Sequence, residues 1–253
     1  GNTFKMLSDA LFYNNIATLC YDKRGIGQSK VEQKEEDVRF EDFVNDAKAW
    51  IDQLSEDKRF SDIILIGHSE GSLIGMIAAQ NNPKVAKYIS IAGVGVPAPD
   101  ILKEQLGKQM QGQPEAIKNM VFSYIDKLEH GETIQDVPVY LNALFRPSVQ
   151  PYMISWFKYN PQTEISKLTI PVLLLQGTTD IQVGTDQAEL LAKANPKAQK
   201  TIIENMDHVL KISETKDMTE QLKNSYNNPD TPVSKALVKI ITGFIKEKHG
   251  VAI

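Results

Sequence analysis

Residues 67–71 read Gly-His-Ser-Glu-Gly, between an apolar run at 63–66 and a segment at 72–80 that predicts a helix. A serine on a sharp turn between a strand and a helix needs small neighbours, because its backbone is strained and larger side chains would collide. Such a turn lifts the Ser69 hydroxyl above the sheet edge, where N–H groups at the start of the helix face any oxyanion. The pattern therefore predicts a nucleophilic serine rather than an ordinary glycine-rich turn.

The composition is that of a globular protein. The chain has 253 residues, 42% of them hydrophobic and 24% charged, enough for one α/β domain with an insertion. The net charge of −4 and the dispersed lysines argue against nucleic acid as the main partner. No apolar stretch reaches membrane-spanning length. The first residue is glycine rather than methionine, so the sequence leaves the native start, any signal peptide, the compartment and the oligomeric state undetermined.

The single cysteine, Cys20, lies in the apolar run 16–21, which we predict to be a buried strand. A lone cysteine excludes an intrachain disulfide, and burial favours a small core residue over a reactive thiol. The sequence contains no Cys/His cluster of the kind that binds a metal, and we expect no metal and no organic cofactor.

Strand and helix patterns alternate over most of the chain, which predicts an α/β fold: a mainly parallel sheet with helices on both faces. The predicted strands cover 16–21, 62–66, 87–92, 170–175 and 200–204. Residues 98–168 break this alternation, because they show helical patterns without a strand and are rich in aromatic residues. We therefore divide the chain into a core, 1–97 and 169–253, and a helical cap, 98–168.

A serine hydroxyl is a weak nucleophile until a base removes its proton, and imidazole suits that role near neutral pH. His208 follows the predicted strand 200–204, at the same carboxyl edge of the sheet as Ser69. The other histidines lie inside the turn, where the side chain should point away from the serine, in the helical segment, and near the C-terminus (His68, His130 and His249). His208 is therefore the candidate base.

The imidazole needs an anion that fixes its tautomer and stabilises the imidazolium. Asp180 follows the predicted strand 170–175 and should lie at the same edge of the sheet. Asp186 is better interpreted as a charge at the start of the next helix, and Asp207 adjoins His208 too closely to orient it easily. The order serine, aspartate, histidine is that of the α/β-hydrolases.

Four stretches together resemble the α/β-hydrolase superfamily: YDKRGIGQS at 21–29, GHSEG at 67–71, QGTTD at 176–180 and NMDHVL at 205–210. More narrowly, the chain is similar to bacterial carboxylesterases grouped with serine aminopeptidase-like hydrolases and acetyl-xylan-type esterases. The resemblance covers nearly the whole chain. It implies Ser69 as nucleophile, His208 as base, Asp180 as acid, and the helical cap over the substrate pocket.

The same resemblance implies further strands before residue 1, one of them central in the sheet and followed by a loop that supplies an oxyanion N–H. The other implied donor, the backbone N–H of Glu70, is present. We expect the central strand to exist as an upstream part of the chain, a separate piece or a strand of another copy. The alternative is direct pairing between 16–21 and 62–66.

These observations favour a serine hydrolase that cleaves small-molecule carboxylic esters through an acyl-enzyme. We expect an apolar pocket lined by aromatic residues of the cap, namely Phe145, Tyr152, Trp156 and Phe157. The natural ester and its acyl length stay undetermined.

Two alternatives stay open. An aminopeptidase or amidase would need acidic residues that hold a substrate ammonium, for which the cap offers Glu129, Glu132 and Asp136, although these are better interpreted as solvent-facing. A non-catalytic binding protein on the same fold is the other, because fold alone does not determine function.

Overall fold

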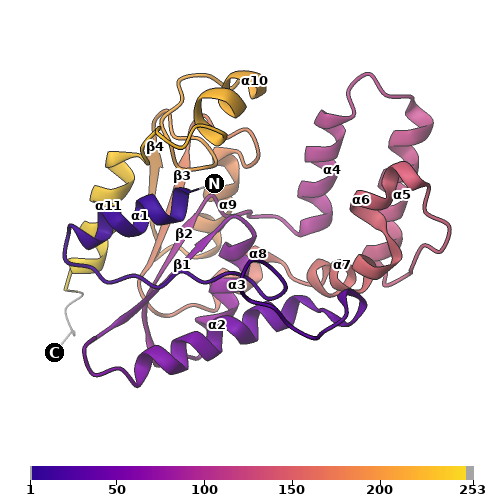
Figure 1. Ribbon diagram of the computed structural model, residues 1–253. Helices are drawn as coiled ribbons and strands as arrows, with labels where there is room; N and C mark the ends of the chain where they lie inside the picture. Colours follow the sequence, from indigo (N-terminus) through magenta and orange to yellow (C-terminus); the bar gives the residue numbers. More distant parts are fainter. Residues whose placement is uncertain (1, 249–253) are drawn as a thin grey trace.

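Four parallel strands in chain order form the central sheet of the structure, a computed structural model that describes residues 2–248 (Figure 1). Neighbouring strands pair directly: Ile66 lies beside Ile89, which in turn lies beside Leu173. The strands are β1 (Ile63–His68), β2 (Val85–Ile91), β3 (Val172–Gly177) and β4 (Gln199–Ile203). Parallel neighbours need long crossover connections, and helices occupy each of them here.

Helices cover both faces of this sheet, as the sequence predicts. On one face lie α2 (Phe40–Ser55), α3 (Glu70–Ala78), α8 (Pro161–Ser166) and α9 (Thr185–Ala194); on the other lie α1 (Thr3–Phe12) and α11 (Lys235–Lys246). Strand β3 shows the cause, since successive side chains of a strand point to opposite faces. Leu174 belongs to the hydrophobic cluster that includes residues of α2 and α3. Leu173 and Leu175 belong to the cluster that includes residues of α1 and α11. Each face thus buries its own core.

Between β2 and β3 the chain forms a helical insertion, residues 98–168, most of which stands beside the sheet (Figure 1). Its helices are α4 (Ala98–Gln109), α5 (Glu115–Glu129), α6 (Asn142–Phe145) and α7 (Gln150–Phe157), with 3-10 turns at Val139–Leu141 and Pro147–Val149. They enclose a separate hydrophobic cluster that includes Val121, Ile125, Leu128 and Phe157. The last helix, α8, instead packs Ile165 into the core. Between α5 and α7 the helical pattern is interrupted, since residues 139–145 form a 3-10 turn followed by α6.

The remaining elements are short. A 3-10 turn, Glu35–Asp37, precedes α2, and α10 (Met218–Gln221) continues into a π-helical turn, Leu222–Tyr226, after β4. Within residues 2–248, no helix combines the length and apolar character needed to cross a membrane.

The predicted strand at 16–21 is wrong. This segment has no regular secondary structure, and Cys20 is exposed rather than buried. Across the described residues, β1 pairs with β2 alone, so the proposed direct pairing of 16–21 with 62–66 does not occur. An apolar run becomes a strand only where a neighbour can bond its backbone. Here the segment is held by side chains, including the ring of Tyr21 stacked on Trp50 at 5.6 Å.

We expect the Cys20 thiol of the native protein to react with Ellman's reagent, because it is exposed and is the only cysteine in the sequence. Partial burial raises the pKa of this thiol, so the reaction should accelerate from pH 7 to pH 9 as the thiolate forms. The absorbance change should match that of the protein in denaturant, and Cys20→Ser should show none. Reaction only after denaturation would contradict the exposed position of Cys20 and favour the predicted burial.

Candidate active site

Ser69 occupies the turn between β1 and α3 in a backbone conformation that side chains disfavour, with φ 54° and ψ −120°. Its N–H donates to the carbonyl of Ile91 at 3.0 Å, which ties the turn to the end of β2. A Cβ on Gly67 would lie 2.2 Å from the carbonyl oxygen of Gly71, so only glycine fits there. The second glycine of the motif has open space around it and is not sterically required.

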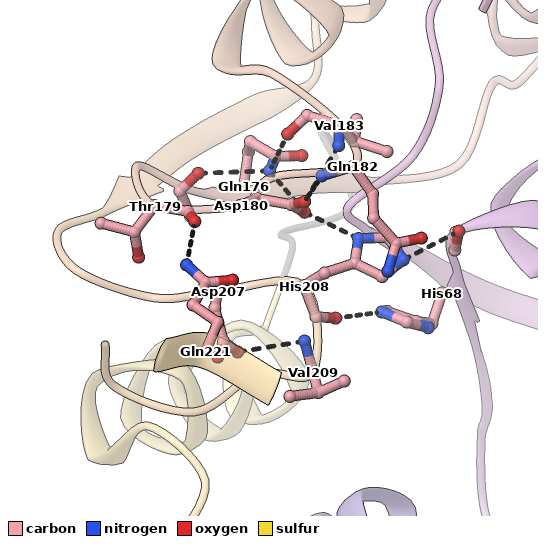
Figure 2. A network of polar contacts seen from close by, with 12 residues as sticks. His68, Gln176, Thr179, Asp180, Gln182, Val183, Asp207, His208, Val209 and Gln221 are labelled. Carbon is pink, nitrogen blue, oxygen red and sulfur yellow. Dashed lines mark hydrogen bonds and ion pairs between the residues drawn. The ribbon is translucent and has the colours of Figure 1, made fainter. Parts of the chain in front are cut away.

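The structure brings the three residues selected from the sequence into one hydrogen-bonded chain. Nδ1 of His208 lies 2.8 Å from Oδ2 of Asp180 (Figure 2). Its Nε2 lies 3.1 Å from Oγ of Ser69. The three residues follow the carboxyl ends of β4, β1 and β3, which meet at one edge of the sheet. His208 and Asp180 are buried at 5% and 6% exposure, so bulk water does not compete strongly for their hydrogen bond.

Asp180 is held by more than the imidazole. Its Oδ1 accepts hydrogen bonds from the backbone N–H groups of Gln182 and Val183, at 2.8 and 2.9 Å, and its Oδ2 accepts one from Nε2 of Gln176 at 3.1 Å. Burial opposes the charged form, but the bonds from His208 and the two backbone groups outweigh it and lower the pKa of Asp180. The carboxylate is therefore ionised at neutral pH. The sequence analysis does not identify Gln176 as a partner of Asp180. The only sequence feature that indicates it is a polar residue near the end of a buried strand.

A second buried carboxylate, Asp207, holds the loop that carries His208. It accepts hydrogen bonds from the N–H groups of Val209 and Lys211 and from the hydroxyl of Ser225. Burial, the largest effect, raises the pKa of Asp207. These bonds hold the Asp207 carboxylate against its own loop and against Ser225.

The backbone N–H of Glu70 opens α3 and has no carbonyl partner in the helix, because the first N–H groups of a helix never do. The side chain of Glu70 accepts a hydrogen bond from the hydroxyl of Tyr152 in α7. Its other oxygen lies 3.6 Å from Nζ of Lys23. Burial and the neighbouring carboxylate raise the pKa of Tyr152, which therefore stays a hydrogen-bond donor. These contacts join the helical insertion to the serine turn.

The four aromatic residues predicted to line a pocket lie in different surroundings. Phe145 and Phe157 are buried in the hydrophobic cluster of the insertion. Trp156 stacks on Tyr152, with the ring centroids 6.1 Å apart. Tyr152 borders a cavity of about 470 Å³, whose other apolar walls are Ile26, Val31, Val38, Phe43 and Val149. Val31 and Val38 belong to the charged stretch 30–38, which the sequence pattern does not identify as a pocket wall.

The other candidates from the sequence lie away from the serine or outside the described residues. His130 is exposed at the end of α5, and His249 lies outside the described residues. The acidic residues weighed for an ammonium site, Glu129, Glu132 and Asp136, are exposed. Among residues 2–248 there is no group of three or more His, Cys, Asp or Glu side chains placed to hold a metal ion.

Known proteins share features with this chain. The family described as serine aminopeptidase, S33, matches residues 1–139. An esterase from Exiguobacterium antarcticum is similar in structure, at 16% identity and a TM-score of 0.59 over 97% of this chain and 87% of that one. An esterase of Pyrococcus furiosus gives 14% identity and a TM-score of 0.57, covering 96% and 74% of the two chains.

A third structure, a lipase-esterase related protein from Clostridium acetobutylicum, is 20% identical, with a TM-score of 0.54 over 88% of each chain. No curated protein matches the sequence. These structural likenesses show the fold that the sequence predicts, an α/β-hydrolase fold.

Replacing Gly67 by alanine should destabilise the protein, because the added Cβ would overlap the carbonyl of Gly71. Overpacking of this kind typically costs about 1–3 kcal/mol. The free energy of unfolding, measured in urea, should fall by that amount or more. Gly71→Ala is the matched control, since its Cβ would meet no atom within 4 Å and alanine favours a helix. Equal stability of the two variants would contradict the steric argument.

Proposed function

The chain belongs to the serine aminopeptidase S33 family of the α/β-hydrolase superfamily, and we propose that it hydrolyses small-molecule carboxylic esters through an acyl-enzyme. The observation that carries the proposal is the hydrogen-bonded chain from Asp180 through His208 to Ser69. A buried acid, a base and a serine on a strained turn form the arrangement that activates a hydroxyl for acyl transfer.

In the proposed reaction, Oγ of Ser69 attacks the ester carbonyl while Nε2 of His208 takes the hydroxyl proton. The charged Asp180 stabilises the resulting imidazolium, and the N–H of Glu70 donates to the oxyanion. Collapse of the tetrahedral intermediate breaks the bond to the alcohol, which leaves with the proton from the imidazolium. Water then attacks the acyl-enzyme with the same base, releasing the acid and restoring the serine.

Contacts around the serine favour esters over aminoacyl amides that carry a free ammonium group. The three acidic residues weighed for this role, Glu129, Glu132 and Asp136, are exposed, as the sequence predicts, and offer no enclosed ammonium site. The carboxylate beside Ser69 belongs to Glu70, and its charge is already engaged by Lys23 and by the hydroxyl of Tyr152. Hydrolysis of an aminoacyl amide remains the alternative that the family description brings, and an assay distinguishes the two.

We assign residues 98–168 as the helical cap of this enzyme. The hydrogen bond between Tyr152 and Glu70 supports this assignment, because it places α7 against the residue that follows the nucleophile. We propose that the cavity bordered by Tyr152 takes the apolar part of the ester. Trp156 supports the ring of Tyr152 by stacking, while Phe145 and Phe157 hold the cap together from its interior.

Replacing Ser69 by alanine should abolish labelling by a fluorophosphonate and lower kcat for p-nitrophenyl acetate by about 10⁴- to 10⁶-fold. His208→Ala should have a similar effect, and the double variant should lose little more, because the two residues act as a unit. His130→Ala, which replaces an exposed histidine, is the control and should keep full activity. Absence of labelling in the unmodified protein would favour the non-catalytic alternative. Turnover of aminoacyl p-nitroanilides above that of p-nitrophenyl esters would favour an aminopeptidase.

Filling the cavity should shorten the preferred acyl chain. Val149→Phe adds bulk to the cavity wall, so kcat/KM for p-nitrophenyl octanoate should fall about 10-fold relative to the acetate. Val139→Phe is the matched control, because Val139 is 86% exposed and does not border the cavity. If both variants keep the original ratio of octanoate to acetate, the cavity does not bind the acyl chain.

A further inference from the structure

We propose that His68 is a positioning residue that holds the catalytic base in place through the backbone of His208. This inference rests on the proposed function. The sequence predicts no catalytic role for His68, because a side chain inside the turn should point away from Ser69. The ring makes its hydrogen bond with the loop of the base instead (Figure 2).

The contact joins two residues that are 140 positions apart in the chain. Nε2 of His68 lies 2.8 Å from the carbonyl oxygen of His208. The two imidazole rings also pack together, with centroids 4.8 Å apart, and the ring of Phe4 meets His68 edge-on at 5.4 Å. The ring is therefore fixed by one hydrogen bond and by contacts from two other elements.

The chemistry of the acceptor determines the tautomer. A carbonyl oxygen only accepts hydrogen bonds, so Nε2 of His68 must carry a proton. Burial is the main cause that lowers the pKa of His68 to about 4, and the charges of His208 and Lys23 lower it further, while the carbonyl bond and Asp180 oppose the shift. The ring is thus neutral near pH 7, with the proton on Nε2 and none on Nδ1.

A neutral donor suits this position. When His208 takes the serine proton it becomes an imidazolium, and a second positive ring 4.8 Å away would disfavour that charge. His68 supplies an N–H without such a charge. Because it directly precedes Ser69, one end of β1 fixes the nucleophile through its backbone and the base through a side chain. The 3.1 Å contact between Ser69 and His208 is thereby held from both sides.

The test compares a substitution that removes the donor with one that keeps it. In His68→Leu the carbonyl of His208 loses its partner, so kcat should fall, by up to about 100-fold, with KM nearly unchanged. His68→Gln offers an amide N–H at a comparable reach and should recover most of that loss. His130→Gln, at an exposed histidine, is the matched control and should leave kcat unchanged. Equal losses in His68→Leu and His68→Gln, or no loss in His68→Leu, would overturn the proposal.

A second measurement needs no activity and therefore separates this inference from the proposed function. Nitrogen-15 NMR of the labelled histidines should show His68 as the Nε2–H tautomer, with no titration between pH 5.5 and 8. The Nδ1–H tautomer, or a ring that titrates in this range, would overturn the proposal even if the protein is an active esterase. The expected tautomer in a protein without ester turnover would support the contact while the proposed function fails. The NMR result also decides the matter if His68→Leu does not fold.

Discussion

The backbone of Ser69 is the constraint on which the rest of the site depends. A side-chain-bearing residue at φ 54° costs on the order of 1–3 kcal/mol, and such a conformation persists only where its surroundings enforce it. Here β1 and β2 are paired up to His68, the N–H of Ser69 donates to Ile91, and α3 begins at the next residue. The close approach of Gly67 to Gly71 lets helix and strand meet at this angle. The strained turn thus places a hydroxyl where two other strands end.

Two buried carboxylates, Asp180 and Asp207, hold His208 and its loop, and their pKa values shift in opposite directions. Asp180 gains enough hydrogen bonds to remain charged in spite of burial, and its charge faces the imidazole of His208. For Asp207 burial is the larger effect and raises the pKa, while its bonds to Lys211 and Ser225 fix the loop instead. Asp180 therefore supplies the negative charge that faces the imidazole. Asp207, which precedes His208 in the chain, fixes the geometry of the loop.

The sequence predicts those features that depend on chain order. Ser69, Asp180 and His208 each follow an apolar run, and parallel strands bring their carboxyl ends to one edge, so their meeting follows from the pattern alone. Cys20 shows the limit, because its apolar run predicts a strand but cannot show whether a neighbour lies beside it. The contact of His68 with the loop of the base depends on tertiary packing, and no local pattern indicates it.

The same limit explains the pocket. Aromatic composition identifies the insertion as a region of large apolar side chains, but it does not separate those that hold helices together from those that face outward. Phe145 is buried at 1% exposure among the helices, whereas Tyr152 reaches the serine turn and borders the cavity. The opposite wall includes Val31 and Val38, which lie in the charged stretch 30–38. A charged stretch does not predict apolar pocket residues. Arg24 also borders the cavity, and its charge is paired with that of Asp46 in α2.

Glu70 joins substrate binding to the proposed chemistry. A carboxylate beside a forming oxyanion would repel it, yet the charge of Lys23 at 3.6 Å offsets the negative charge and the hydroxyl of Tyr152 donates to it. In the proposed mechanism, the backbone N–H of the same residue donates to the oxyanion. Because Tyr152 borders the cavity, a substrate that displaces its ring also disturbs the partner of Glu70 and hence the start of α3. Under the proposed mechanism, the fit of the apolar group and the stabilisation of the oxyanion are therefore coupled through one side chain.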